Sequence, residues 1–160
     1  MVHTKTSHHD RMEVFLEKYR EPLPKPLEEL ERKALSEDVP IIRSGTRDML
    51  RFLLRERKPK EVLEIGTAVG FSAILMAEYD PVECEIITIE NYEKRIPIAR
   101  ENFKKAGKEE QITLLEGDAA KILKTLEGSY DFIFMDAAKG QYIHWLPDIL
   151  RLLSTGGVLF

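Results

Sequence analysis

The stretch that decides the fold is VLEIGTAVGFSA, at positions Val62–Ala73. Its first residues are apolar and branched, which predicts a short buried strand over 61–65. Gly66 permits a tight turn after this strand, and the apolar run over 72–79 has the composition of a helix. A buried strand that passes through glycines into a helix is typical of the first unit of a parallel α/β sheet.

The rest of the chain repeats this alternation of strand and helix. Consecutive strand–helix–strand units form right-handed parallel pairs, so we predict an α/β fold with a Rossmann-like, doubly wound parallel sheet. Pro97 falls inside the second connecting helix and is expected to distort it. Further strands are predicted over 85–89, 111–115, 130–135 and 157–160, and further helices up to 106 and over 120–126 and 142–152.

The first part of the chain has a helical pattern instead. We interpret residues 1–160 as one domain, with an N-terminal helical region over 1–58 and a sheet-containing core over 59–160. The core is expected to end inside its fifth strand. Three helices separated by prolines are predicted in the first region, from a capping box at Asp10, over 27–35, and from Ser44 or Thr46 to Pro59.

Composition excludes several classes of protein. The 160 residues are 43% hydrophobic and 32% charged, which excludes a disordered chain or a fibre. Cys84 is the single cysteine, so no intramolecular disulfide can form and a reducing, cytoplasmic location is expected. No window has the roughly 18–20 apolar residues of a membrane span, so no membrane partner is expected. The net charge of −4 disfavours a protein that coats nucleic acid.

Acidic residues and glycines follow the predicted strands at the end where doubly wound sheets bind ligands. Glu90 lies 24 residues after Gly66, where a carboxylate can accept the ribose hydroxyls of an adenosine cofactor. Asp118 lies in a turn and could take the amino group of an adenine. Asp136 follows a buried apolar strand, where a carboxylate is costly unless it binds a cation or donors. Gly66 and Gly70 have the spacing G-x-x-x-G rather than G-x-G-x-x-G, which disfavours a nicotinamide dehydrogenase.

Four motifs together carry a resemblance to a known family: VLEIGTAVGFSA, ITIEN at 87–91, LLEGDA at 114–119 and FIFMDAAKGQY at 132–142. In this order and spacing they resemble the cation-dependent S-adenosylmethionine O-methyltransferases of the catechol and caffeoyl-coenzyme A type. The string DAAKGQY is similar to the bacterial branch that methylates 5-hydroxyuridine at the wobble position of transfer RNA. The resemblance implies the class I methyltransferase sheet, whose last two strands would follow Phe160.

The resemblance implies a role for each matched residue. Asp136 would bind a divalent cation, usually Mg²⁺, and Lys139 would be the general base, so these two are the expected catalytic residues. Gly70 would let the start of the next helix approach the ligand, and the positive end of that helix would favour a carboxylate bound at Ser72. The full set expected to bind S-adenosylmethionine is Ile42, Glu64, Gly66, Thr67, Ala68, Gly70, Ser72, Glu90, Asn91, Asp118, Ala119, Asp136 and Ala137.

These residue types suit methyl transfer to an oxygen. A hard cation can hold two neighbouring oxygens of the acceptor and lower the pKa of the attacking hydroxyl, and a nearby lysine can take its proton. Catechol and 5-hydroxyuridine both offer two neighbouring oxygens, so a small catechol-like molecule is the alternative to transfer RNA. The family's other cation ligands, an acid and an asparagine, would lie beyond Phe160. A non-catalytic fragment that binds the cofactor is therefore a third alternative.

A basic segment precedes the first strand. Residues 43–60 contain seven Lys or Arg against two Asp or Glu, although the chain as a whole is acidic. On a helix with about 100° per residue, Arg47, Arg51 and Arg55 fall within an arc of roughly 80°, while the apolar side chains over 49–54 face the core. Because arginine binds phosphates well, this row is the candidate surface for transfer RNA, and a solvated basic face is the alternative.

Three further residues, His144, Trp145 and Cys84, are expected to have structural roles rather than roles in the site. His144 and Trp145 follow the last motif and are expected to lie on a helix surface or in the core rather than in the site. Cys84 precedes a buried strand and is expected to be an inert thiol. A homo-oligomer is also considered, since a sheet that ends at an uncovered strand can pair with another chain.

Overall fold

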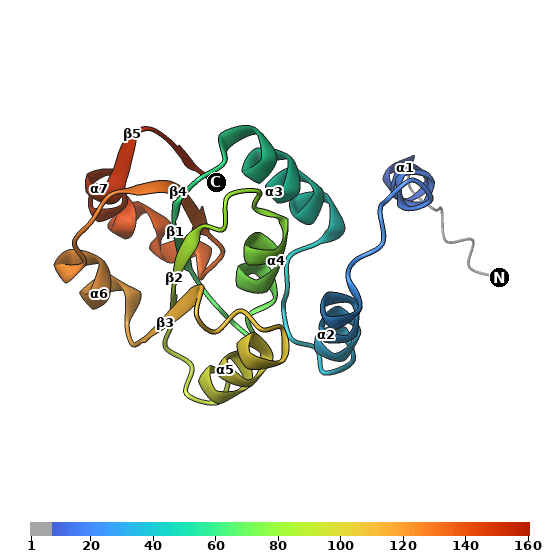
Figure 1. Cartoon of the computed structure of the whole chain (residues 1–160), viewed down its shortest axis with the longest axis horizontal. Helices are drawn as coiled ribbons and strands as arrows, with labels where there is room; N and C mark the ends of the chain where they lie inside the picture. The colour runs from blue at the N-terminus through green and yellow to red at the C-terminus, as the bar shows by residue number, and fades with distance from the viewer. Residues whose placement is uncertain (1–7) are drawn as a thin grey trace.

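The centre of the molecule is a five-stranded parallel sheet with the strand order β3-β2-β1-β4-β5 (Figure 1). The computed structural model describes residues 8–160. The strands are β1 Glu61–Ile65, β2 Glu85–Glu90, β3 Ile112–Glu116, β4 Tyr130–Met135 and β5 Leu153–Leu159. The chain winds outward from β1 in one direction through β2 and β3, and in the other through β4 and β5. The predicted doubly wound sheet is confirmed, and its switch point lies between β1 and β4, where such sheets bind ligands.

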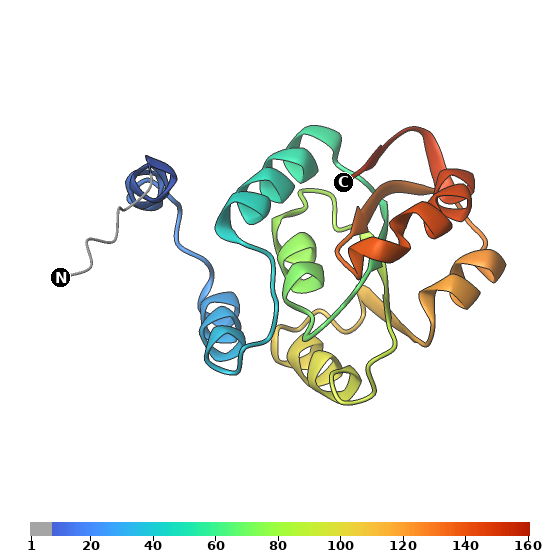
Figure 2. The ribbon, with the colours of Figure 1, turned by 180° about the vertical axis from the view of Figure 1, so that it is seen from behind.

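Helices cover both faces of the sheet (Figures 1 and 2). Helices α2 Lys25–Ser36, α3 Ser44–Arg57, α4 Phe71–Tyr79 and α5 Ile96–Lys105 pack around one face. Helices α6 Ala119–Thr125 and α7 Tyr142–Leu152 cover the other face. Helix α1, His8–Glu17, stands apart from the sheet and its helices in both views.

Helix α4 explains why the deciding stretch is so apolar. Seven of its nine residues, Phe71–Ala77, are buried. The helix packs against α2, α3 and the sheet, so it has almost no side that faces water. A helix with apolar residues all round is stable only in such an interior position. The start of α4 is therefore held firmly beneath the turn that follows β1.

Two expectations about individual residues are wrong. Pro97 does not distort its helix, because α5 begins at Ile96 and places the proline in the first turn, where its missing N–H has no partner in any case. On α3, Leu50 and Leu54 are fully buried as expected, but Met49 and Phe52 are exposed. The apolar arc of α3 is therefore narrower than the sequence indicates. Within residues 8–160, no helix has both the length and the apolar character needed to cross a membrane.

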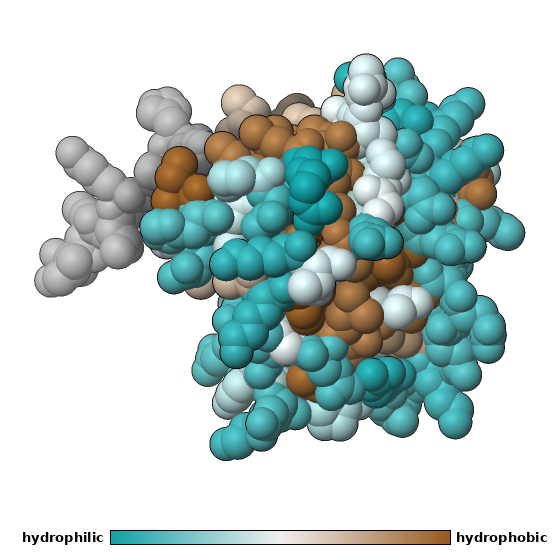
Figure 3. Space-filling view, turned by 90° about the vertical axis from the view of Figure 1, so that its left-hand side faces the viewer, coloured by the Kyte–Doolittle hydropathy of each residue, from teal (hydrophilic) through white to brown (hydrophobic). Residues whose placement is uncertain are grey.

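The side of the molecule that carries α6, α7 and β5 has a hydrophobic surface. Figure 3 shows apolar atoms gathered across the upper part and the centre of this face, between polar margins. Ile143 and Leu150 of α7 are 69% and 56% exposed, and Leu159 and Phe160 at the edge of the sheet are each 36% exposed.

β5 starts four residues earlier than expected, and its pairing with β4 is irregular between Tyr130 and Phe132.

Candidate functional site

The turn after β1 is pressed against the turn after β4. Gly66 has φ +103°, and a Cβ atom at this position would lie 2.6 Å from the carbonyl oxygen of Asp136. The N–H of Gly66 donates to the carbonyl of Ile89, and the N–H of Asp136 donates to that of Ile65, both at 3.0 Å. The ends of β1, β2 and β4 are thus joined through their backbones. Side chains that follow these three strands share one edge of the sheet.

Gly70 has a packing role that the sequence did not indicate. It has φ +86°, and a Cβ atom there would lie 2.5 Å from the ring of Phe103 in α5. Gly70 is buried and lines neither of the cavities described below. The start of α4 nevertheless reaches the second cavity through Phe71 and Ser72, and the expected role of Gly70 in bringing it close to a ligand stays a prediction. Its missing side chain makes room for the packing of α5 against α4.

Glu90, at the end of β2, is tied to the backbone of two turns. Its Oε2 accepts the N–H of Ala68 at 2.7 Å, and its Oε1 accepts the N–H groups of Asn91 and Tyr92 at 2.9 Å each. The residue is only 9% exposed. A carboxylate has about four acceptor sites, so about one remains open to a ligand. Glu90 is held in place before any ligand arrives.

A second acid, Glu64 of β1, lies fully buried beneath the same turn. Its Oε2 accepts the hydroxyl of Thr88 at 2.5 Å, and the hydroxyl of Thr67 lies 2.6 Å from that of Thr88. Since the proton of Thr88 goes to Glu64, Thr67 must be the donor to Thr88. Burial raises the pKa of Glu64 to about 7, although the nearby hydroxyls of Ser72 and Thr88 oppose this rise. Its Oε1 has no hydrogen-bond partner among the residues the structure describes.

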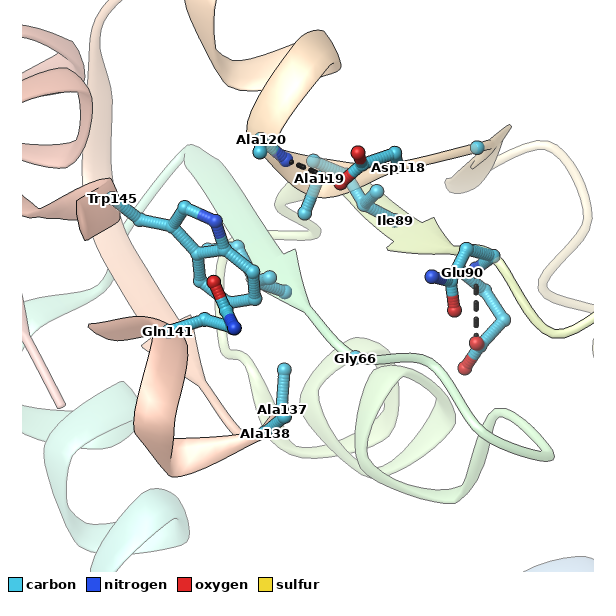
Figure 4. A pocket seen from close by; sticks show the side chains of 13 residues that line it. Gly66, Ile89, Glu90, Asp118, Ala119, Ala120, Ala137, Ala138, Gln141 and Trp145 are labelled. Atoms are coloured by element: carbon cyan, nitrogen blue, oxygen red, sulfur yellow. Dashed lines mark hydrogen bonds between the residues drawn. The ribbon is translucent and has the colours of Figure 1, made fainter. Parts of the chain in front are cut away.

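Two adjoining cavities lie along this edge of the sheet. The first, of about 410 Å³, extends from the end of β1 towards α6 and α7 (Figure 4). The second, of about 550 Å³, extends from the same turn towards the segment before α3. Both volumes are within the range of small-molecule sites, roughly 300–1,000 Å³. The residues that line both are Gly66, Glu90, Asn91, Ala137 and Ala138.

Most of the residues expected to bind the cofactor line one of these cavities. Asp118 and Ala119 line the first cavity, and the carboxylate of Asp118 also accepts the N–H of Ala120 at 2.9 Å as the N-cap of α6. Glu64 and Gly70 line neither cavity. Those that line the second cavity alone are Ile42, Thr67, Ala68, Ser72 and Asp136, and the expected base Lys139 lines it too.

The turn after β4 carries Asp136 and Lys139 into the second cavity. Burial raises the pKa of Asp136, and the nearby Lys139 ammonium opposes this effect. The hydroxyl of Tyr142 donates to the carbonyl groups of Met135 and Ala137, at 2.8 and 3.2 Å. Tyr142 therefore fixes the backbone on both sides of Asp136. The structure brings the two expected catalytic residues together on one short turn.

The sequence interpretation missed Trp145 and Gln141 as site residues. Both line the first cavity, and Figure 4 shows the Gln141 side chain lying across the indole of Trp145, opposite Ala119 and Asp118. Trp145 is 7% exposed, and its Nε1 has no hydrogen-bond partner among the described residues. Trp145 is thus both a core residue, as expected, and a wall of the cavity. The available signal was its position on α7, one turn after the motif that ends at Tyr142.

The arginine row of α3 is not an exposed stripe. Arg47 and Arg51 are 5% and 7% exposed, and Arg47 pairs with Glu31 at 2.9 Å. Arg51 pairs with Glu21, and its guanidinium lies 4.1 Å from the centre of the Tyr79 ring. The expectation that these arginines face outward is wrong for Arg47 and Arg51, because acidic residues of the N-terminal region cover them. Arg55 alone is largely exposed.

Comparison with known proteins places this geometry in a family. A family model described as O-methyltransferase matches residues 18–160. A caffeoyl-CoA O-methyltransferase of Stellaria longipes is 31% identical over 117 residues, which are 69% of this chain and 48% of that protein. A catechol O-methyltransferase of Niastella koreensis is 34% identical over 114 residues, 69% of this chain and 52% of that protein. The chain spans about half the length of these curated relatives.

Solved structures agree with the sequence comparison. The SAH-bound methyltransferase PaMTH1 of Podospora anserina has a TM-score of 0.90 and 34% identity, and covers 99% of this chain and 70% of its own. The O-methyltransferase of Bacillus cereus, in complex with SAH, has a TM-score of 0.83 and 25% identity. This match covers 93% of this chain and 70% of the Bacillus cereus chain. Fold, site motifs and sequence identity therefore lead to one conclusion: the chain belongs to the O-methyltransferase family.

Proposed function

We propose that this chain provides the cofactor-binding part of an S-adenosylmethionine-dependent O-methyltransferase. The observation that carries the proposal is the pair of joined cavities at the switch point of the sheet, with Glu90 held at their boundary by three backbone N–H groups. An adenosyl cofactor needs a polar group for its ribose and an adjoining space for its base, and both are present. The relatives named above are methyltransferases, three of them described as O-methyltransferases, and two were solved with SAH bound.

The residues fit the cofactor along its length. The first cavity, with Asp118, Ala119 and Trp145, suits a flat base, and Glu90 suits the ribose. The second cavity, with Ser72 at the start of α4, suits the methionine part, because the N–H groups of a helix start favour a carboxylate. Gly66, which lines both cavities, lets the turns after β1 and β4 meet, since a side chain there would collide with the turn of Asp136.

We propose a catechol-like small molecule as the methyl acceptor. Its place would be the second cavity, beside Asp136 and Lys139. S-adenosylmethionine supplies an electrophilic methyl group when bound. Lys139 would accept the proton of the acceptor hydroxyl at Nζ, so that the hydroxyl oxygen could take up the methyl carbon while the bond from this carbon to the sulfonium sulfur breaks and SAH leaves. Holding the acceptor in line with that carbon supplies most of the remaining rate enhancement.

A divalent cation at Asp136 stays a prediction. Over residues 8–160 no group of three or more His, Cys, Asp or Glu side chains is placed to hold a metal ion. Asp136 would be one ligand, and these residues do not complete a site. We therefore assign no step of the reaction to a cation. Transfer RNA also stays a prediction as the acceptor, but the exposed arginine row that favoured it is not present.

Calorimetry with SAH tests the cofactor site directly. Glu90→Ala removes hydrogen bonds to a charged group, worth roughly 1.5–3 kcal/mol each, so the affinity should fall at least tenfold. Glu116→Ala is the matched control, because Glu116 ends the neighbouring strand β3 opposite Glu90 but is exposed. Unchanged SAH affinity in Glu90→Ala, or a preference of the chain for NAD over SAH, would overturn the proposal.

The acceptor chemistry is tested in a protein that spans the full length of the relatives. Lys139→Ala should lower the rate of catechol methylation by about 10²–10⁴, the usual range for a general base, while the affinity for SAH stays within twofold. Asp136→Ala should abolish methylation. A normal rate in Lys139→Ala would show that another group takes the proton.

A further inference from the structure

Two arginines that line the second cavity have no carboxylate partner within residues 8–160. Arg43 lies in the segment before α3 and Arg95 directly precedes α5. Neither forms an ion pair within 4 Å in the part of the chain that the structure describes, whereas Arg47 and Arg51 on the nearby α3 both do. The guanidinium of Arg95 lies 5.2 Å from the centre of the Tyr92 ring, a contact that holds it without neutralising it. Arg43, which is exposed, and Arg95, which is half-buried, are therefore two positive charges without a paired carboxylate at one cavity.

The acids of the cavity lie near groups other than the two arginines. Glu90 accepts three backbone N–H groups, and the nearby Lys139 on the same turn opposes the rise in the pKa of Asp136 that burial causes, although no ion pair within 4 Å joins the two. The cofactor of the proposed function adds a net positive charge, because its sulfonium and ammonium groups outnumber its carboxylate. With this cofactor bound, the cavity has an excess of positive charge that a neutral catechol does not balance. With SAH, whose net charge is zero, a smaller excess remains, because Arg43, Arg95 and Lys139 outnumber Glu90 and Asp136. Uncompensated charge in a partly enclosed site favours an oppositely charged ligand.

Building on the proposed function, we infer that the methyl acceptor is an aromatic molecule that carries a carboxylate, which Arg43 and Arg95 bind. A guanidinium presents two parallel N–H groups that match the two oxygens of a carboxylate. The carboxylate of the cofactor has its own donors, since Ser72 and the start of α4 line the same cavity. The two arginines can therefore bind the acceptor, and the pair determines the specificity of the site for its acceptor.

Calorimetry with two probes tests this inference. In a Mg²⁺-containing buffer saturated with SAH, 3,4-dihydroxybenzoate should bind at least tenfold more tightly than catechol. Arg95→Gln and Arg43→Gln should each weaken 3,4-dihydroxybenzoate binding at least fivefold and leave catechol and SAH within twofold. Arg55→Gln is the matched control, because Arg55 is an exposed arginine of α3 outside the cavity. The preference for the acid should also shrink as salt is added.

Each other outcome has a defined meaning. Equal affinity for the two probes, or binding of neither while SAH binds, overturns the inference and leaves the proposed function standing. A loss of SAH affinity in Arg43→Gln or Arg95→Gln, with the preference for the acid unchanged, shows that the arginines serve the carboxylate of the cofactor and also overturns the inference. Failure of the wild-type chain to bind SAH would count against the proposed function itself.

Discussion

The carboxyl edge of the sheet and the arginine row of α3 both hold charged side chains away from water, but they do so in opposite ways. At the sheet edge, Glu90 is held by backbone N–H groups, and the space beside it stays open. On α3, Arg47 and Arg51 are held by side chains of the N-terminal region, Glu31 and Glu21, and no charge is left over. One arrangement prepares a charge for a ligand, while the other uses its charges to fasten two parts of the same chain.

The difference shows what makes a buried charge available. Backbone donors come from turns whose shape is fixed by neighbouring strands, so they can hold a carboxylate without filling the cavity. A side-chain partner neutralises the charge and fills the space around it. The basic segment over 43–60 is therefore split in function: its covered arginines connect α3 to α2 and the segment before it, while Arg43 lines the cavity.

The largest effect is expected from filling the gap between the turns of the sheet edge. Gly66→Ala places a methyl group against the Asp136 carbonyl and forces a side chain into φ +103°. We expect the free energy of unfolding to fall by about 2–4 kcal/mol and SAH affinity by at least a hundredfold. The control is Gly45→Ala on α3, which has nothing within 4 Å and should gain about 0.5–1 kcal/mol. Urea denaturation measures the free energy of unfolding, and calorimetry measures SAH affinity. If Gly66→Ala changes neither quantity, the turns are not tightly joined.

A pH series separates the buried acid Glu64 from the acids that face the cavity. Because the pKa of Glu64 rises on folding from 4.5 to about 7, its contribution to stability is complete below pH 4.5 and is lost as pH rises through 7. The loss between pH 5 and 8 should be at most about 3 kcal/mol. Glu64→Gln should remove this part of the pH dependence, while Glu109→Gln, at an exposed position, should retain it. The measurement is urea denaturation at pH 5 and at pH 8. An equal change in the free energy of unfolding between these pH values in wild type and Glu64→Gln would contradict the assignment.

Breaking the arginine row should affect stability but not the site. Arg47→Ala leaves Glu31 without its partner and removes a buried side chain, so we expect a loss of about 1–3 kcal/mol. Arg55→Ala, at a side chain 57% exposed, should cost less than about 0.5 kcal/mol. SAH affinity should stay within twofold in both variants. A tenfold fall in SAH affinity for Arg47→Ala, measured by calorimetry, would mean that the row shapes the cavity as well.

The smallest effect on stability, about 0.5 kcal/mol or less, is expected at the hydrophobic face of α7. Ile143 and Leu150 are exposed there, near the edge strand β5, and such surfaces promote association between chains. Sedimentation velocity should show self-association of the wild type at high concentration, and Ile143→Lys combined with Leu150→Lys should reduce it. Lys124→Glu on α6 is the control. A wild-type chain that stays monomeric at high concentration would contradict this expectation.

The sequence by itself determined the fold and most of the sheet edge. Apolar branched runs fix the buried strands, and regular strand–helix alternation leaves a right-handed parallel sheet as the consistent topology. Residues that end a strand or directly follow one, such as Glu90 and Asp136, must then lie at one edge, so their proximity could be predicted. Boundaries of strands and helices shifted by a few residues, because the last hydrogen bonds of an element depend on its neighbours.

Only the tertiary structure decided which partner each side chain takes. Arg47 and Arg51 meet acids 16 and 30 residues away, and helical periodicity places a residue on a face without saying what covers that face. The same holds for Gly70, where the ring of Phe103 in α5 occupies the space that a side chain would need. It also holds for Trp145, which reaches the first cavity through the packing of α7 on the sheet. Local pattern follows from the backbone, whereas burial, charge pairing and cavity shape depend on segments that meet only when the chain folds.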